Sequence, residues 1–333
     1  MLVVLLLLSL LIFLVYNLFP ADKAADTARQ ELQLSPWLNY DERYLYWSRR
    51  YGLDGNVFIR YLRWLGVYPF TDPLTGGSAG LNGILQGNFG TSVSYGKPVI
   101  EVMKEPLANT VFLNLLATTA GLAVTIPLGV FCAVKRGSKR DTAVQVGTVI
   151  GYSMPVFIIA ILFIWLFAVK LDIFPVSGMN SVGANYTGFR AFLDRLYHLA
   201  LPLIVMTFCS LGGMTRYVRS SMIDALSLDC IRTARAKGLS EHAVVYRHAF
   251  KNALLPIMTL VIGWFLSIFS GSIMVENVFG LNGIGKVYFD ALSVNDTEIA
   301  LALQMFYVVV ALVGNLLTDA AYGLVDPRIR IGG

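Results

Sequence analysis

The chain has 333 residues, of which 56% are hydrophobic and 14% are charged, and its net charge is +5. Soluble domains carry about 25% charged residues, so this composition excludes an ordinary soluble globular protein. The mean hydropathy of +0.64 favours a membrane protein. The basic residues are spread over several short segments, which argues against a nucleic-acid-binding surface.

Six apolar stretches predict membrane-spanning helices, because each approaches or exceeds the roughly 17–25 residues that cross a bilayer. They are residues 1–19, 110–134, 144–169, 201–215, 254–275 and 299–321. The fourth is short, and we expect it to continue as a helix to residue 225, with Arg216 and Arg219 at the membrane interface. Pro127, Pro155 and Pro202 are expected to kink or break the spans that contain them. The sequence therefore predicts an all-α integral membrane protein with six transmembrane helices.

Residues 1–20 are expected to form a retained first transmembrane helix. A signal peptide is the alternative, but no basic residue precedes the apolar run and no small-residue cleavage site follows it. Residues 21–109 predict an extracytoplasmic loop or lid, in which 57–65 form a short amphipathic helix and the Gly- and Pro-rich segment 69–83 stays irregular. Two functions of this loop stay open, a packed cover and a docking surface for a soluble binding partner.

The distribution of Lys and Arg predicts the orientation in the membrane. Segments 135–143, 216–251 and 322–333 hold thirteen basic residues, whereas the short segments 170–198 and 279–298 hold four. By the positive-inside rule, the first set and both termini are cytoplasmic. No disulfide is expected, because the three cysteines lie in spans or on the cytoplasmic side. No metal site is expected either, because the three histidines lie on two different sides of the membrane.

Residues 110–333 are expected to form a five-helix core that carries a polar helix-turn-helix on its cytoplasmic side, at residues 229–253. Asp229 is a candidate N-cap of its first helix, Gly238 occupies the position of a C-terminal glycine, and Ser240 can cap its second helix. The apolar positions expected to share one face of the second helix are Ala243, Tyr246, Phe250 and Ala253. This insert is too basic to cross a bilayer, which predicts a docking element for a cytoplasmic partner.

Two other motifs favour ordinary structural roles. Residues 280–286 nearly match a phosphate-binding loop, but Val287 follows Lys286 where a Ser or Thr should bind magnesium, and no strand precedes the segment. Asp319 is the one acid within the predicted spans, and a proton relay would need others at depth. An intramembrane enzyme and an autonomous channel or carrier are therefore the disfavoured alternatives.

Seven segments of the chain form a familiar set of motifs. They are 151–157 (Gly-Tyr-Ser-Met-Pro-Val-Phe), 175–178 (Pro-Val-Ser-Gly), 198–202 (His-Leu-Ala-Leu-Pro), 215–222 (Thr-Arg-Tyr-Val-Arg-Ser-Ser-Met), 231–238 (Ile-Arg-Thr-Ala-Arg-Ala-Lys-Gly), 248–256 (His-Ala-Phe-Lys-Asn-Ala-Leu-Leu-Pro) and the ending with Asn315, Asp319, Tyr322 and Asp-Pro-Arg-Ile-Arg at 326–330. These segments resemble the peptide subfamily of ABC-importer permeases, in particular the first of the two permeases of dipeptide and oligopeptide importers. The resemblance covers about residues 51–330.

This resemblance implies the type I ABC-importer permease fold, and it implies that the segment matching residues 231–256 couples the permease to its ATPase subunit. The residues implied in coupling are Arg232, Ala234, Arg235, Ala236, Gly238, His248 and Asn252. The two alanines are small enough for close helix docking, and Gly238 permits a tight turn. Arg232 and Arg235 are expected to pair with acidic groups on the ATPase.

The resemblance also implies the partners. They are a homologous second permease, two ATP-binding cassette subunits and an extracytoplasmic substrate-binding protein, assembled in the plasma (inner) membrane of a bacterium or archaeon. The chain would be a non-catalytic subunit without a cofactor of its own, since ATP and magnesium would bind to the ATPase subunits. Peptides are the implied substrate, while nickel, glutathione and sugars stay open.

The chain departs from the family pattern at three places. The acidic residue that opens the Glu-Ala-Ala form of other importers is replaced, as it is in the peptide subfamily. The Arg-rich start that is common in the family is absent. Residues 68–85 resemble an insertion before Gly-Asn-Phe-Gly-Thr-Ser at 87–92.

Overall fold

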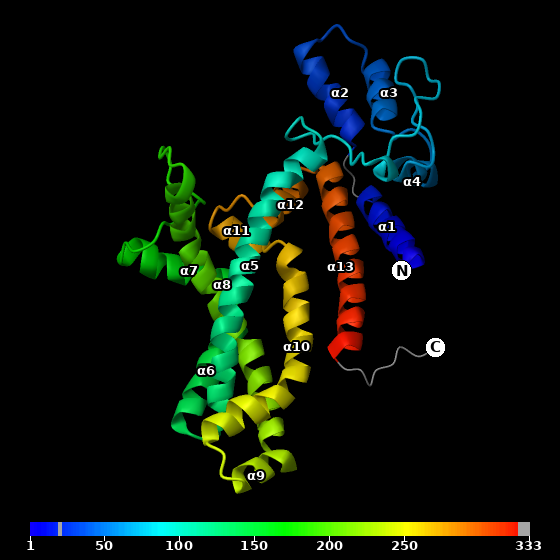
Figure 1. Cartoon of the computed structure of the whole chain (residues 1–333). Helices are drawn as coiled ribbons and strands as arrows, with labels where there is room; N and C mark the ends of the chain where they lie inside the picture. The colour runs from blue at the N-terminus through cyan, green and yellow to red at the C-terminus, as the bar shows by residue number, and fades with distance from the viewer. Residues whose placement is uncertain (19–21, 326–333) are drawn as a thin grey trace. The chain divides into compact units, whose positions relative to one another are not determined.

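The computed structural model describes residues 1–18 and 22–325, and it is built almost entirely of helices (Figure 1). Within these residues the only β-type pairings are two isolated bridges, Thr71 with Ser78 and Thr91 with Pro98. The chain divides into two compact units. Unit 1 combines Met1–Lys104 with Tyr288–Val309, and unit 2 combines Glu105–Val287 with the chain from Val310 onward.

Unit 1 contains one apolar helix and the segment predicted as a lid. Its elements are α1 (Leu2–Asn17), α2 (Lys23–Leu34), α3 (Tyr40–Arg50), α4 (Val57–Leu65) and the 3-10 turn η1 (Ile84–Gln86). The side chains of Asp22, Asn39 and Asn56 cap the N-termini of α2, α3 and α4. The predicted helix at 57–65 is confirmed, and 69–83 forms helix-free loops as expected.

Helices α2 and α3 form an antiparallel hairpin that is held by one carboxylate. Both oxygens of Glu31 accept hydrogen bonds from the Arg43 guanidinium, at 2.7 and 2.6 Å, and Oε2 also accepts one from the Trp47 indole at 2.8 Å. The hydrogen bonds from Arg43 hold the pKa of the Glu31 carboxyl below its ordinary value. A three-way charge-assisted contact of this kind fixes the angle between the two helices.

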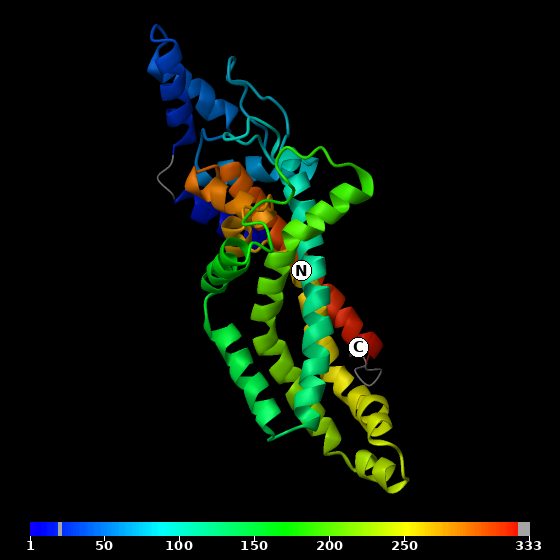
Figure 2. The same cartoon turned by 90° about the vertical axis from the view of Figure 1, so that its left-hand side faces the viewer.

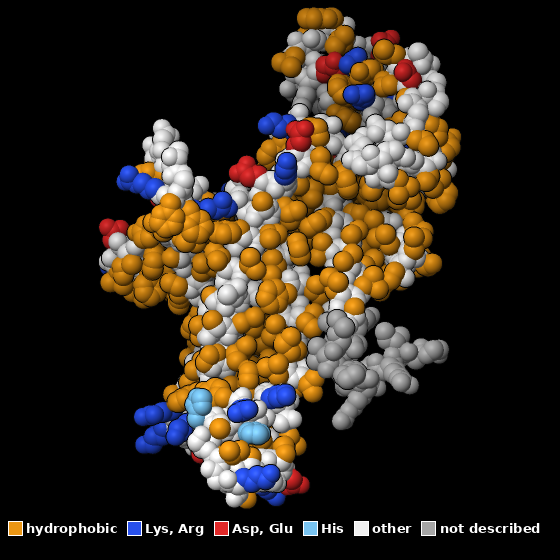
Figure 3. Space-filling model, viewed as in Figure 1, with side chains coloured by type: hydrophobic (Ala, Val, Ile, Leu, Met, Phe, Trp, Pro, Cys, Tyr) orange, Lys and Arg blue, Asp and Glu red, His pale blue; other side chains and the backbone are white. Residues whose placement is uncertain are grey.

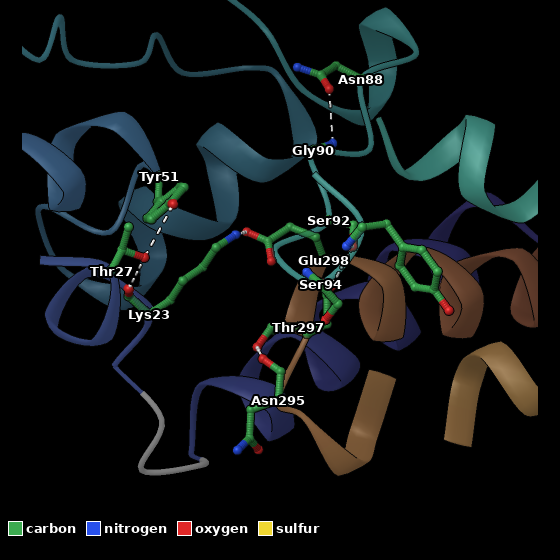
Figure 4. A network of polar contacts seen from close by, with 12 residues as sticks. Lys23, Thr27, Tyr51, Asn88, Gly90, Ser92, Ser94, Asn295, Thr297 and Glu298 are labelled. Carbon is green, nitrogen blue, oxygen red and sulfur yellow. Dashed lines mark hydrogen bonds and ion pairs between the residues drawn. The ribbon is translucent and has the colours of Figure 1, made fainter. Parts of the chain in front are cut away.

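A polar network ties the lid segment to the start of α13 (Thr297–Val325). Lys23 forms an ion pair with Glu298, and the two side chains point toward one another (Figure 4). The Ser92 hydroxyl donates to Oδ2 of the buried Asp296 at 2.6 Å, and the main-chain N–H of Ser94 donates to the same oxygen at 3.1 Å. These contacts join positions that are 202 to 275 residues apart in the sequence, so they fix the segment predicted as a lid within unit 1.

Unit 2 is a bundle of long helices with several breaks. Its elements are α5 (Val99–Val134), α6 (Lys139–Ser153), α7 (Val156–Phe163), the π-helical η2 (Ile164–Lys170), α8 (Gly188–Leu226), α9 (Asp229–Ala236), the π-helical η3 (Ala243–Ala249), α10 (Phe250–Leu266), the 3-10 turn η4 (Ser267–Phe269) and α11 (Ile273–Val278). Three helices are divided between the units: the first residues of α5, up to Lys104, belong to unit 1, α12 (Ile284–Ser293) begins in unit 2 and ends in unit 1, and α13 begins in unit 1 and continues in unit 2 from Val310.

Three helices in the described residues are long and apolar enough to cross a membrane: α5, α8 and Thr297–Thr318 of α13. The number rises to five if each of two bent helix pairs is one span. Helix α1 is apolar but has 16 residues, fewer than the roughly 20 of a typical span. The expected count of six spans is therefore not confirmed, although the predicted continuation of the fourth span to residue 225 is confirmed by α8.

Two predicted spans are not continuous helices. The stretch 144–169 is bent by 106° between α6 and α7, because Pro155 lacks an N–H and holds Met154 in an extended conformation. The stretch 254–275 leaves the helix after Phe269, and an extended link precedes α11. By contrast, Pro127 and Pro202 lie inside the unbroken helices α5 and α8.

Glycines bring α5 and α6 into close contact with α8 (Figure 2). A Cβ atom added to Gly212 would lie 2.5 Å from the Tyr152 Cβ and 2.8 Å from the Thr148 carbonyl oxygen of α6. One added to Gly129 of α5 would lie 2.6 Å from the Val218 Cβ of α8. Since these spaces admit no side chain, the three helices pack nearly backbone to backbone.

Candidate functional site

The polar insert predicted at 229–253 lies at the end of unit 2 opposite α11 (Figure 1). Exposed basic side chains gather at this end, which Figure 3 shows at the bottom. They come from the α5–α6 connection, from α9 and from the segment after it, and they are Lys135, Arg136, Lys139, Arg140, Arg232, Arg235, Lys237, Arg247 and Lys251. The clustering agrees with the charge asymmetry that predicts a cytoplasmic location.

Helix α9 has one face inside the protein and one face exposed. Ile231 and Ala234 are buried in an apolar cluster with α5, α8 and α10, and Ala234 is only 5% exposed. Arg232, Arg235 and Ala236 are exposed. Ala234 is therefore a residue that anchors α9 to the protein itself, and its small side chain allows that close contact.

The start of α9 differs from the prediction. Leu228 occupies the N-cap position without a side-chain cap, and Asp229 is the first helical residue. Asp229 still favours the helix, because a carboxylate in the first turn faces the positive end of the helix dipole. The predicted glycine at the other end is confirmed: Gly238 has φ of +78°, and its N–H donates to the Arg235 carbonyl oxygen at 2.9 Å.

Both arginines that were predicted to take part in coupling already have partners in this chain. Arg235 forms an ion pair with Glu241 at 2.9 Å, which bridges the turn around Gly238. Arg232 lies 3.5 Å from Asp229, one helical turn away. All four side chains are exposed, so these pairs are weak and can be exchanged for others.

The helix after the turn is capped as predicted, but its buried face is different. Ser240 accepts a hydrogen bond from the N–H of Ala243 at 3.3 Å. Tyr246, expected on the apolar face, is 51% exposed. The buried positions are Val244, Val245, Ala249 and Ala253, of which only Ala253 was predicted, and the predicted Phe250 is partly buried against the same cluster. The reason is that residues 243–249 form a π-helix, whose wider turn rotates the following side chains away from the spacing of an α-helix.

The two remaining predicted residues lie on the same side of this segment. His248 is partly buried in η3, and its carbonyl oxygen accepts a hydrogen bond from the exposed Asn252 side chain at 2.8 Å. Asn252 also lines a groove of about 390 Å³ between α8 and α10, together with Tyr217, Ser221, Asp224 and Pro256. All seven predicted positions thus lie within α9 and the segment that follows it. The Asp-Pro-Arg-Ile-Arg ending at 326–330 lies outside the described residues.

Two buried polar contacts were not anticipated from the sequence. Arg219 of α8, expected at the membrane interface, forms an ion pair with the buried Asp141 of α6. Glu276 of α11 has no exposed surface and accepts hydrogen bonds from Thr110 of α5 and from the main chain at Lys286. Glu276 directly follows the predicted span that ended at residue 275.

The segment resembling a phosphate-binding loop is occupied by the protein's own side chains. The N–H of Ile284 donates to the Thr110 hydroxyl at 2.8 Å, and the N–H of Lys286 donates to Glu276 Oε2 at 2.9 Å. A phosphate would need those same N–H groups, and it would be repelled by the carboxylate. Among the described residues, no group of three or more His, Cys, Asp or Glu side chains is arranged to hold a metal ion.

Comparisons with known proteins identify the family. Residues 125–331 match the model of the binding-protein-dependent transport system inner membrane component. The chain is 35% identical over 313 residues to the oligopeptide transport system permease protein AppB of Bacillus subtilis, covering 94% of this chain and 92% of the relative. It is 32% identical over 339 residues to the dipeptide transport system permease protein DppB of Escherichia coli K12, covering 97% and 94%.

The fold is also that of a solved permease. A chain of the MetNI methionine ABC transporter in an inward-facing conformation matches with a TM-score of 0.51 and 16% identity, over 66% of this chain and 96% of that chain. The predicted all-α type I importer permease fold is thereby confirmed. The chain is a membrane-spanning ABC importer permease, a member of the binding-protein-dependent transport system inner membrane component family.

Proposed function

We propose that this permease forms half of the translocation pathway of an importer for peptides that an extracytoplasmic binding protein delivers. Two relatives that align with nearly the whole chain are named as oligopeptide and dipeptide permeases. A homologous second permease would complete the pathway, and two ATP-binding cassette subunits would drive it. ATP and magnesium belong to those subunits, and this chain contributes no catalysis.

The observation that carries the proposal is the construction of α9. The helix is anchored to α5, α8 and α10 through Ile231 and Ala234, and it presents Arg232, Arg235 and Ala236 on its free face. A partner that pulls on the free face therefore moves the long helices behind it. Each state of the ATPase must contact this face differently for hydrolysis to bias the permease between inward-open and outward-open states.

The proposed topology follows from the same basic end. The α9 side, the α5–α6 connection and both termini would be cytoplasmic in a bacterial or archaeal inner membrane. Residues 1–20 would be the first span, residues 21–109 an extracytoplasmic lid, and residues 110–333 the core with its coupling segment at 229–253. The lid, fixed to the start of α13 by Lys23–Glu298 and Ser92–Asp296, would meet the binding protein.

The deciding experiment reconstitutes the chain with its second permease and ATPase subunits in liposomes and adds the binding protein. We expect ATP-dependent uptake of labelled di- and oligopeptides. Uptake of nickel, glutathione or a sugar in place of peptides would change the substrate, and uptake without the ATPase subunits would indicate an autonomous carrier.

A matched pair of variants tests the coupling face in the same liposomes. Ala236→Glu adds a carboxylate to the free face of α9, whereas Thr142→Glu adds one to an exposed position in the first turns of α6. We expect Ala236→Glu to lose the ATPase subunits or the dependence of uptake on hydrolysis, while Thr142→Glu behaves as the unmodified protein. Equal behaviour of the two variants would remove the coupling role of α9.

A further inference from the structure

Glu276 is a completely buried carboxylate at the meeting point of three elements. Its Oε1 accepts hydrogen bonds from the Thr110 hydroxyl of α5 at 2.9 Å and from the N–H of Ser272 before α11 at 3.2 Å. Its Oε2 accepts one from the N–H of Lys286, in the first turn of α12, at 2.9 Å. No cationic side chain forms an ion pair with it in the parts of the chain that the structure describes.

The surroundings require a side chain with two acceptor oxygens. Both carboxylate oxygens accept hydrogen bonds from main-chain N–H groups, and the first turn of α12 presents the positive end of its helix dipole. A glutamine would turn its amide N–H₂ toward one of these donors. The shape is equally restrictive: a Cβ atom on Gly283 would overlap the carboxylate, and one on Gly285 would lie 3.0 Å from Oε2. The fold therefore leaves room for this one group and supplies only donors to it.

The same face of α5 binds the neighbouring main chain. The Asn114 amide donates to the carbonyl oxygens of Ile268 and Ser270 at 2.9 and 2.8 Å. The Asn109 amide donates to the carbonyl oxygen of Asn282 at 2.8 Å, and its own oxygen accepts from Arg195 at 2.6 Å. Side chains of α5 therefore hold residues 268–286 at both ends and, through Thr110 and Glu276, in the middle.

The contacts between α5 and residues 268–286, here called the junction, lie where they can transmit a movement of α10 to α5. Helix α10 runs from the coupling segment to residue 266, and residues 268–286 continue directly from it. At one end, α10 shares the apolar cluster that contains Ile231 and Ala234 of α9. At the other end, the junction ties the continuation of α10 to α5. A displacement of α10 is thus passed to α5 through hydrogen bonds centred on one carboxylate.

We propose that Glu276 is a positioning residue for transport, which makes α5 follow α10 when the coupling segment moves. This rests on the proposed importer function. Without the carboxylate, α10 would move and ATP would be hydrolysed, but only Asn109 and Asn114 would hold residues 268–286 on α5, so α5 would follow less closely and less substrate would pass. The loss therefore affects the amount of peptide taken up per ATP hydrolysed, and leaves the assembly of the complex intact.

The test uses the complete complex in liposomes with four forms of this chain: unmodified, Glu276→Gln, Thr110→Val and Thr110→Ser. Thr110→Val is nearly isosteric but has no hydroxyl, and Thr110→Ser keeps it. Loss of a hydrogen bond to a charged group shifts an equilibrium by about tenfold to a hundredfold. We expect uptake per ATP hydrolysed to fall by about that factor in Glu276→Gln and Thr110→Val, with Thr110→Ser close to the unmodified chain, while subunit stoichiometry stays unchanged.

The outcomes separate this proposal from the importer function. If the unmodified complex takes up no peptide, the proposed function fails. If it takes up peptide and both Glu276→Gln and Thr110→Val keep the normal uptake per ATP, the positioning role is overturned. If the complex with Glu276→Gln does not assemble, the comparison of Thr110→Val with Thr110→Ser decides whether the hydrogen bond matters. A loss of uptake per ATP in both Thr110 variants would assign Thr110 a packing role and contradict the proposal.

Discussion

Arg219 of α8 donates two parallel hydrogen bonds to Asp141 of α6, from Nε to Oδ1 at 2.8 Å and from Nη2 to Oδ2 at 2.7 Å. The N–H of Gly137 adds a third bond to Oδ2, at 2.9 Å. The Asp141 side chain is 3% exposed. The ion pair adds a polar contact between α6 and α8, which also pack closely at Gly151 and Gly212. It therefore fixes the α5–α6 connection close to the helix that leads into α9.

Asp141→Asn should destabilise the protein by about 3 kcal/mol, the lower end for breaking a buried pair, because the Arg219 guanidinium is partly exposed and can be hydrated. The measurement is thermal unfolding of the purified protein in detergent. Lys139→Asn, an exposed change two residues away, is the control and should leave the melting temperature nearly unchanged. A similar melting temperature for both variants would show that the pair contributes nothing.

Ala234→Glu and Ala236→Glu should have different effects although they lie two residues apart. At position 234 the new carboxylate enters the apolar cluster with no partner, and we expect about 2–5 kcal/mol of destabilisation. At position 236 it is exposed, and the isolated protein should unfold at its usual temperature. Thermal unfolding combined with co-purification of the ATPase subunits checks this. Equal melting temperatures would contradict the burial of Ala234.

Gly238→Val should impair the turn after α9 through backbone strain alone. The residue has φ of +78°, and nothing lies within 4 Å of an added Cβ, so no steric clash contributes. We expect a cost of about 1–2 kcal/mol and a loss of ATPase binding or of coupled uptake. Gly238→Asn is the control, because asparagine tolerates a left-handed conformation and should retain most function. Uptake in liposomes as effective with Val as with Asn would argue against a required turn geometry.

Cys230, exposed on α9, should react with a membrane-impermeant thiol reagent only from the cytoplasmic side. Intact cells should leave it unlabelled, and inside-out vesicles should label it. A suitable external control is Val182→Cys in a Cys230→Ser background, since Val182 is fully exposed whereas the neighbouring Ser181 is bonded to Asp194. Labelling of Cys230 in intact cells at the level of that control would invert the proposed orientation.

The isolated chain should neither bind nor hydrolyse ATP, because the main-chain donors of residues 284–286 are already bonded to Thr110 and Glu276. Binding of a fluorescent ATP analogue to the purified subunit measures this. Lys286→Ala should make no difference. Saturable binding that disappears in this variant would mean that the loop can exchange its internal carboxylate for a phosphate.

Sequence patterns predicted most of what depends on local chemistry. The amphipathic helix at 57–65, the turn at Gly238 and the cap at Ser240 follow from propensities within a few residues, and the structure contains all three. The family resemblance predicted the fold, and the comparisons confirm it.

The predictions failed where distant segments decide the outcome. Hydropathy alone treats 144–169 and 254–275 as uniform. The expectation that Pro155 breaks its span is confirmed by the bend after Ser153, but no residue was expected to break the helix after Phe269. Asp141 and Glu276 are single acids whose partners lie 78 and 166 residues away in the sequence. Nothing near either residue signals its burial, since only the folded chain supplies the guanidinium or the cluster of donors.

The π-helical turn at Ala243–Ala249 makes the orientation of α9 depend on how these residues are wound. A π-turn holds one more residue than the α-turn it replaces. Deleting a single residue there would let the turn close to an ordinary α-helix without rotating its neighbours, but winding the same residues as an α-helix would rotate everything before them by about 100° around the axis of α10, since an α-helix has 3.6 residues per turn. The exposed arginines of α9 would then face a different direction. In this protein the orientation of α9 is set by the winding of this turn as much as by any side chain.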